Sequence, residues 1–227
     1  MILFFIIAPL LLISPNIVYA VTKNKSLFHV MKVIKNFFAM PTTVIHELGH
    51  ALMAIFTFGK AHYIQLRSDL SGIAVTSSPN RLAVFFVKIA GYTTASAVSY
   101  IMFKMLIEQA YEELFIMALV ISALALYFIR NFFGVLWLIS FGGLFYSLFY
   151  YEQYDIIGFL FTFLVLLNSV VAWVDTYALV RMTATAPHIV SDATDLSKLT
   201  KIPAIVWSFS FFTFASYLLF LQLQLIL

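Results

Sequence analysis

The feature that most constrains this chain is a series of long apolar stretches separated by short polar connections. A bilayer core of about 30 Å requires roughly 20 apolar residues per helix. The stretches that approach or meet this length are residues 2–20, 37–58, 82–107, 114–129, 132–150, 156–180 and 202–227. Only 10% of the residues are charged, against about 25% in a typical soluble domain. We therefore predict an all-α, multi-pass integral membrane protein, a bundle of about seven transmembrane helices.

The first apolar stretch also admits an interpretation as a cleaved signal peptide. Residues 18–20 (Val, Tyr, Ala) resemble a small-residue cleavage site. However, no Lys or Arg precedes the stretch, and its apolar run is longer than a usual signal core. We therefore expect these residues to remain in the protein as a helix.

The positive charges in the connections predict the orientation, because Lys and Arg concentrate in cytoplasmic connections. With seven spans, the connections on one side carry Lys60, Arg67, Arg81, Arg130, Arg181, Lys198 and Lys201. The other side carries four lysines together with Glu108, Glu112, Glu113, Glu152 and Asp155. We expect the first side to be cytoplasmic, the amino terminus to lie inside, and the protein to reside in the cell membrane.

The composition also excludes several classes of protein. The net charge of +3 is spread thinly and cysteine is absent, which argues against a nucleic-acid binder and a disulfide scaffold. The connections are too short for a second folded domain, so we expect one membrane-embedded domain over residues 1–227. Without cysteine, a transition-metal site must be built from His, Asp and Glu.

The second apolar stretch contains the motif His-Glu-x-x-His, formed by His46, Glu47 and His50. Positions i and i+4 share one face of a helix, so both imidazoles can bind one Zn²⁺ ion. Glu47 would then be the general base for water that the metal activates. With 5 His and 5 Glu among 227 residues, chance would produce the motif only about two times in a thousand. We therefore predict a zinc site and hydrolytic chemistry.

A zinc site of this kind needs a third protein ligand, with water in the fourth position. Asp175 is the acidic residue inside an apolar span, and Asn168 lies close to two turns before it. Asp175 is therefore our first candidate, with pairing to Arg181 as the structural alternative. Asp192 is the second candidate, although Ser191, Asp192 and Thr194 are also typical of a helix start.

The connection from residue 59 to residue 80 predicts a short β-hairpin, because alternating residues around 64–67 and 73–76 flank a polar turn. Such a hairpin could pair with an extended substrate segment or merely fill a cavity. In the third apolar stretch Lys88 interrupts the apolar run and could face an aqueous cavity.

Two other classes of function remain open at this stage. A non-proteolytic zinc-binding membrane scaffold would hold the metal with four protein ligands. A transporter would suit the intramembrane polar residues and Lys88, but transporters often show paired broken helices in two related halves, and none is visible.

The chain resembles the site-2 protease clan, specifically the B-like branch of peptidase family M-fifty. The resemblance rests on TTVIHELGHALMAIFTFGK, SGIAVTSS, IAGYTTASA, RNFFG and SDATDLSKLTKIPAIVW, which follow in order over most of the length. It implies a zinc-dependent endopeptidase that cleaves a membrane-protein substrate within or beside its span, with His46, Glu47 and His50 in the roles above.

The resemblance also has consequences for the third ligand and for regulation. In well-known members of the clan the third ligand is an Asp followed by Gly, in a helix that also carries an Asn and a Pro. Here Thr176 follows Asp175, and no Pro follows Asn168 in that stretch. No inserted PDZ-like domain is present, so regulation of that kind would require a separate membrane partner.

Overall fold

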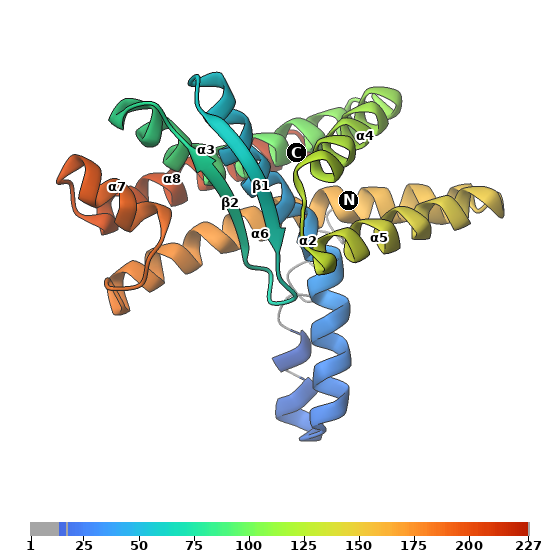
Figure 1. Ribbon diagram of the computed structural model, residues 1–227. Helices are drawn as coiled ribbons and strands as arrows, with labels where there is room; N and C mark the ends of the chain where they lie inside the picture. Colours follow the sequence, from blue (N-terminus) through green and yellow to red (C-terminus); the bar gives the residue numbers. More distant parts are fainter. Residues whose placement is uncertain (1–13, 17, 227) are drawn as a thin grey trace.

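The computed structural model describes residues 14–16 and 18–226, and helices dominate them. The elements are α2 (Lys25–Phe56), β1 (Lys60–Leu66), β2 (Gly72–Ser77), α3 (Arg81–Ile107), α4 (Tyr111–Phe128), α5 (Phe132–Tyr150), α6 (Tyr154–Thr185), α7 (Asp192–Thr200) and α8 (Ala204–Gln224). Figure 1 shows the β1–β2 hairpin lying over α2, with the other helices extending to both sides. The predicted helical class and the predicted hairpin are both confirmed.

Five of these helices, α3, α4, α5, α6 and α8, are long and apolar enough to cross a membrane. The predicted count of seven is not confirmed. Most of the stretch 2–20 lies outside the described residues. The stretch 37–58 belongs largely to α2, which is not among the five. The polar motif residues His46, Glu47 and His50 lower its mean hydropathy. The side chains that predict a metal site therefore also make this stretch less apolar than a typical membrane span.

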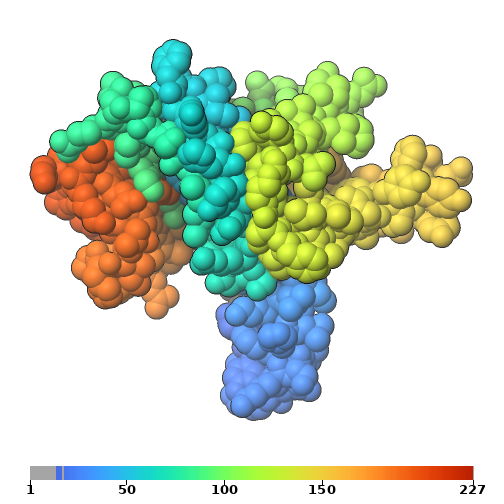
Figure 2. Space-filling view, viewed as in Figure 1, coloured from blue at the N-terminus to red at the C-terminus, as the bar shows by residue number. Residues whose placement is uncertain are grey.

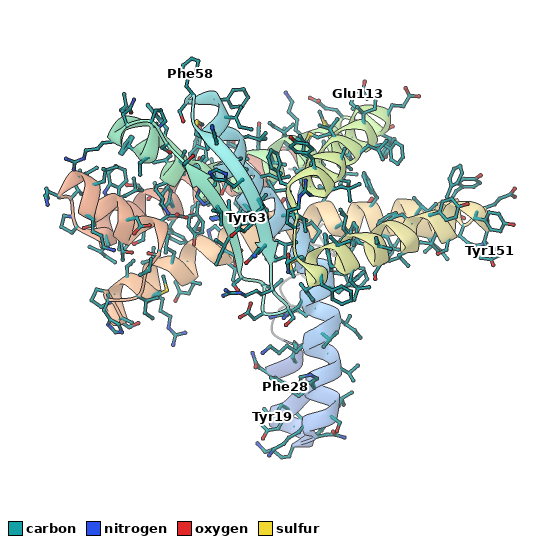
Figure 3. All side chains as sticks on the ribbon, in the orientation of Figure 1. Tyr19, Phe28, Phe58, Tyr63, Glu113 and Tyr151 are labelled. Carbon is teal, nitrogen blue, oxygen red and sulfur yellow. The ribbon has the colours of Figure 1, made fainter. Side chains whose placement is uncertain are left out.

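Helix α2 consists of a protruding part and a buried part. Its first turns project away from the body of the protein (Figures 1 and 2), and Val30 and Val33 are exposed there. Near the far end of this projection the rings of Tyr19 and Phe28 lie 5.5 Å apart (Figure 3). From Ala39 onward most of the helix is buried, so the motif lies in the part that the rest of the protein encloses.

A proline inside α2 creates a specific contact with α5. Pro41 has no backbone N–H, so the carbonyl of Phe37, one turn earlier, lacks its helical partner. The indole Nε1 of Trp137 donates a hydrogen bond to that carbonyl at 3.0 Å. Around this contact, Val44 and Leu48 pack in one cluster with Trp137 and the buried residues of β1. The motif helix is therefore fixed against the hairpin and α5.

The two strands pair antiparallel, with Leu66 opposite Gly72 at the turn end. The outer edge of β1 is occupied by the connection between α4 and α5. Arg130 donates its backbone N–H to the Ile64 carbonyl at 3.0 Å. The Asn131 side chain accepts from Leu66 N at 3.0 Å and donates to Leu66 O at 2.7 Å. In the part of the chain that the structure describes, β2 pairs only with β1, which leaves β2 as the open edge.

Candidate metal centre

The two motif histidines lie one turn apart on α2, and their rings converge. The Nε2 atoms of His46 and His50 are 3.1 Å apart, and the ring planes are nearly perpendicular. The Nδ1–H of His50 donates a hydrogen bond to the Val87 carbonyl of α3 at 2.6 Å. This bond fixes the orientation of the ring, and in the neutral imidazole that binds a metal it places the proton on Nδ1 and the lone pair on Nε2. The ring of Tyr92 lies against His46 at a centroid distance of 4.5 Å.

Asp192 completes a group of three metal-binding side chains. Its Oδ2 atom lies 3.4 Å from His46 Nε2 and 3.2 Å from His50 Nε2. Over residues 14–16 and 18–226, this is the only group of three His, Asp or Glu side chains whose donor atoms lie close enough for one ion. The structure therefore brings together the two motif histidines and the second of the two predicted acidic candidates.

The spacing of the three donor atoms can be compared with the geometry that zinc requires. Bonds of about 2.0–2.1 Å in a tetrahedral arrangement place neighbouring donor atoms about 3.3 Å apart. The three donor–donor distances in the group are 3.1, 3.2 and 3.4 Å. The donor set of two neutral imidazoles and one carboxylate also matches zinc. These residues thus fit a tetrahedral zinc ion with its fourth position free of protein ligands.

A glycine in α3 keeps this space open. A Cβ atom added at Gly91 would lie only 2.5 Å from His50 Nε2 and 2.6 Å from His46 Nε2. Any other residue at this position would place a carbon atom against both nitrogens. The absence of a side chain at Gly91 is therefore a requirement of the converging histidine pair.

Glu47 lies beside the histidines at the start of β2. The residue is 5% exposed, and a Cβ added at Gly72 would lie 2.6 Å from its Oε1 atom. The backbone of the hairpin thus approaches this carboxylate as closely as glycine permits. Glu47, the general base that the motif predicts, therefore lies next to the open edge of the hairpin.

Asp192 begins α7, and the sequence pattern explains why. The Ser191 side chain caps the helix and forms a reciprocal capping box with Thr194. The predicted helix start is therefore present, and it also places Asp192 at the histidines. Burial by itself would raise the pKa of Asp192, but the adjacent His50 and His46 hold it well below its usual range. An acidic residue binds a metal in its ionised form.

The other acidic candidate, Asp175, lies in α6 and is not part of this group. It lies within electrostatic range of His46 and of Lys35. Asn168, two turns earlier, accepts a hydrogen bond from Thr42 Oγ1 at 2.6 Å and donates one to Ser99 Oγ at 2.7 Å. Its amide oxygen and its amide nitrogen therefore tie α6 to α2 and α3.

Sequence reasoning did not single out Val87, Gly91 or Tyr92 as parts of the site. The phrase IAGYTTASA in the third apolar stretch contains Gly91 and Tyr92 but not Val87, and it holds no His, Asp or Glu. Val87 contributes a backbone carbonyl, Gly91 the absence of a side chain and Tyr92 an aromatic ring. A sequence pattern for metal ligands contains none of these. They are recognised only once α3 is placed against α2.

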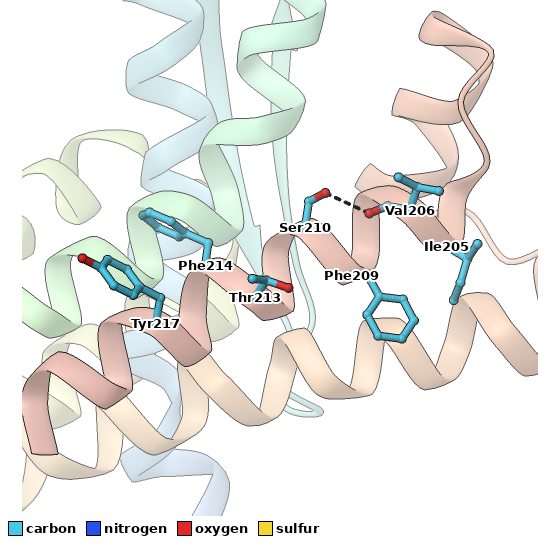
Figure 4. A pocket seen from close by; sticks show the side chains of 7 residues that line it. All are labelled: Ile205, Val206, Phe209, Ser210, Thr213, Phe214 and Tyr217. Atoms are coloured by element: carbon cyan, nitrogen blue, oxygen red, sulfur yellow. Dashed lines mark hydrogen bonds between the residues drawn. The ribbon is translucent and has the colours of Figure 1, made fainter.

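An open groove of about 700 Å³ lies elsewhere, on α8. Figure 4 shows its lining residues, among them Phe209, Phe214 and Tyr217, along this one helix, with the Ser210 hydroxyl bonded back to the Val206 carbonyl. No member of the metal group lines the groove, and α8 is one of the five candidate spans. The groove is therefore separate from the candidate metal centre.

Comparison with known proteins agrees with this geometry. No curated protein and no solved structure matches the chain. A family model described as Peptidase M50B-like matches residues 6–222, nearly the whole length. The His-Glu-x-x-His helix and the converging acidic residue are of the kind found in zinc peptidases. The chain belongs to the Peptidase M50B-like family.

Proposed function

We propose that the protein is a zinc-dependent intramembrane endopeptidase that hydrolyses a peptide bond within or next to the membrane span of a substrate protein. The proposal depends on one observation, the near-tetrahedral spacing of His46 Nε2, His50 Nε2 and Asp192 Oδ2. These three residues would hold the ion, with Asp192 in preference to Asp175 as third ligand. When bound, zinc supplies a Lewis acid that polarises the substrate carbonyl and activates water.

Glu47 is assigned the proton transfers of the reaction. Its carboxylate accepts a proton from the attacking water and then returns it to the amine of the departing peptide segment. Burial of Glu47 beside the histidines keeps this carboxylate close to the reacting bond. The position next to Gly72 orients it toward the hairpin edge.

The open edge of β2 is a suitable place for the substrate backbone. A transmembrane helix hides its carbonyls in its own hydrogen bonds, so a substrate must unwind before cleavage. An extended segment that adds to β2 would replace those bonds with strand pairing. Because β1 is already paired on its other side by Arg130 and Asn131, β2 is the edge assigned to the substrate.

The ligand count favours this function over a structural zinc site. A closed structural site has four protein ligands, whereas a catalytic one has three and an open position. Across the described residues, the metal group has three members. The membrane scaffold considered from the sequence would need a fourth.

The test is the variant Glu47→Gln, with Glu108→Gln at the exposed end of α3 as matched control. Purified proteins are loaded with zinc and incubated in detergent with a panel of single-span membrane proteins. The wild type and Glu108→Gln are expected to produce truncated fragments, and Glu47→Gln to produce none while its zinc content stays unchanged. Fragments from Glu47→Gln at the wild-type rate would refute the assignment.

A further inference from the structure

Lys88 is a charged residue within the membrane-spanning helix α3, and lipid contact does not explain it. Lys88 lies about two turns into the 27-residue helix α3, and at the centre of a span a lysine costs about 2.5–3.5 kcal/mol on insertion scales. The Lys88 side chain is 31% exposed, and its ammonium group points to the short helix α7. Such a residue is retained only where it has a partner or a function.

The partners of Lys88 are two carboxylates one turn apart on α7. Its Nζ atom lies 3.3 Å from Asp192 Oδ1 and 2.8 Å from Asp195 Oδ2. Asp195 is in turn 3.5 Å from Lys198, which lies at the exposed side of α7. The ammonium group is therefore held between a carboxylate of the metal group and one outside it.

The two oxygen atoms of Asp192 thus face different partners. Oδ2 faces the Nε2 atoms of both histidines, whereas Oδ1 accepts a hydrogen bond from Lys88. The hydrogen bond from Lys88 turns Oδ1 toward the ammonium group and withdraws electron density from it, so Oδ2 is the stronger metal-binding oxygen. With one carboxylate oxygen and two imidazoles bound, a tetrahedral ion keeps its fourth position for water or substrate.

We propose that Lys88 is a positioning residue that makes Asp192 a one-oxygen ligand and so keeps the fourth metal position open. This inference rests on the proposed function, because it takes Asp192 as the third ligand. Lys88 does not touch the reacting bond; it acts through Asp192. Asp195 supports the arrangement with a second contact to the ammonium group, while Ala193 and Leu196 anchor α7 in the core.

The experiment replaces zinc with Co²⁺, whose visible absorption is several-fold stronger in four-coordinate than in five- or six-coordinate sites. The full-length protein is titrated with Co²⁺ as the wild type, Lys88→Met, Lys88→Arg and the control Lys104→Met. Lys104 lies near the other end of the same helix and pairs with the exposed Glu108. The wild type, Lys104→Met and Lys88→Arg should show the strong absorption.

In Lys88→Met both oxygens of Asp192 are released to the metal, so the absorption per bound Co²⁺ should fall several-fold. Strong absorption in Lys88→Met at one Co²⁺ per chain would overturn the role of Lys88 and leave the proposed function intact. Absence of Co²⁺ binding by the wild type would overturn the metal centre itself. X-ray absorption of the zinc-loaded wild type needs no variant: a first shell of four N/O atoms is expected, and five or more would contradict the inference.

Discussion

The close approach of Gly91 to the histidines leads to a quantitative prediction for Gly91→Ala. The added Cβ would lie 2.5 Å from His50 Nε2, about 0.9 Å inside the 3.4 Å at which ordinary contacts begin. The ring of His50 cannot swing aside without losing the 2.6 Å bond to Val87. The ring of His46 is confined by Tyr92. The overlap must therefore be relieved by moving α3 away from α2 or by separating the two nitrogens.

Overpacking of this kind costs about 1–3 kcal/mol. If the overlap destabilises only the metal-bound arrangement of the two histidine rings, zinc affinity falls by about 5- to 150-fold, since 1.4 kcal/mol is a factor of ten. Alanine is also the better helix former, by about 1 kcal/mol. Gly91→Ala is thus expected to fold but to bind zinc weakly.

The assay is zinc competition against a chromophoric chelator in detergent, with thermal unfolding measured in parallel. Gly142→Ala in α5 is the matched control, because a Cβ added there meets nothing within 4 Å. The control should keep the wild-type zinc affinity. Wild-type affinity in Gly91→Ala would refute the reasoning, because the space between the rings would then not be the metal site.

Two further predictions follow from the contacts around α2. Asp192→Asn should lower zinc affinity by at least the 10- to 100-fold typical of a lost outer-shell partner, whereas Asp175→Asn should leave the affinity nearly unchanged. Isothermal titration with zinc compares the two variants. A larger loss of affinity in Asp175→Asn would restore Asp175 as the ligand. Trp137→Phe should lower the free energy of unfolding by about 1 kcal/mol. In a Pro41→Ala background the Phe37 carbonyl regains its helical partner, so denaturant unfolding should show a smaller Trp137→Phe penalty; strict additivity would exclude the link.

The motif half of the candidate site could be predicted because it is local. His46, Glu47 and His50 lie within five consecutive residues of one helix, and the helical repeat alone determines which side chains share a face. The same locality made the β-hairpin predictable, since alternation and a polar turn define it within one connection. Apolar length likewise defined the membrane class, although the count of seven spans was not confirmed.

The acidic third member of the metal group could not be predicted in this way. From the sequence, the position of a carboxylate inside an apolar span favoured Asp175 over Asp192. Which of two distant residues reaches the histidines depends on where α7 packs, and that is decided by the burial of Ala193 and Leu196 and by the pairing of Lys88. The sequence by itself therefore determined a helical membrane protein with a histidine pair and a neighbouring glutamate. Only the tertiary structure decided which acid faces the pair and that Gly91 leaves room for an ion, because contacts between distant segments arise from packing and not from local periodicity.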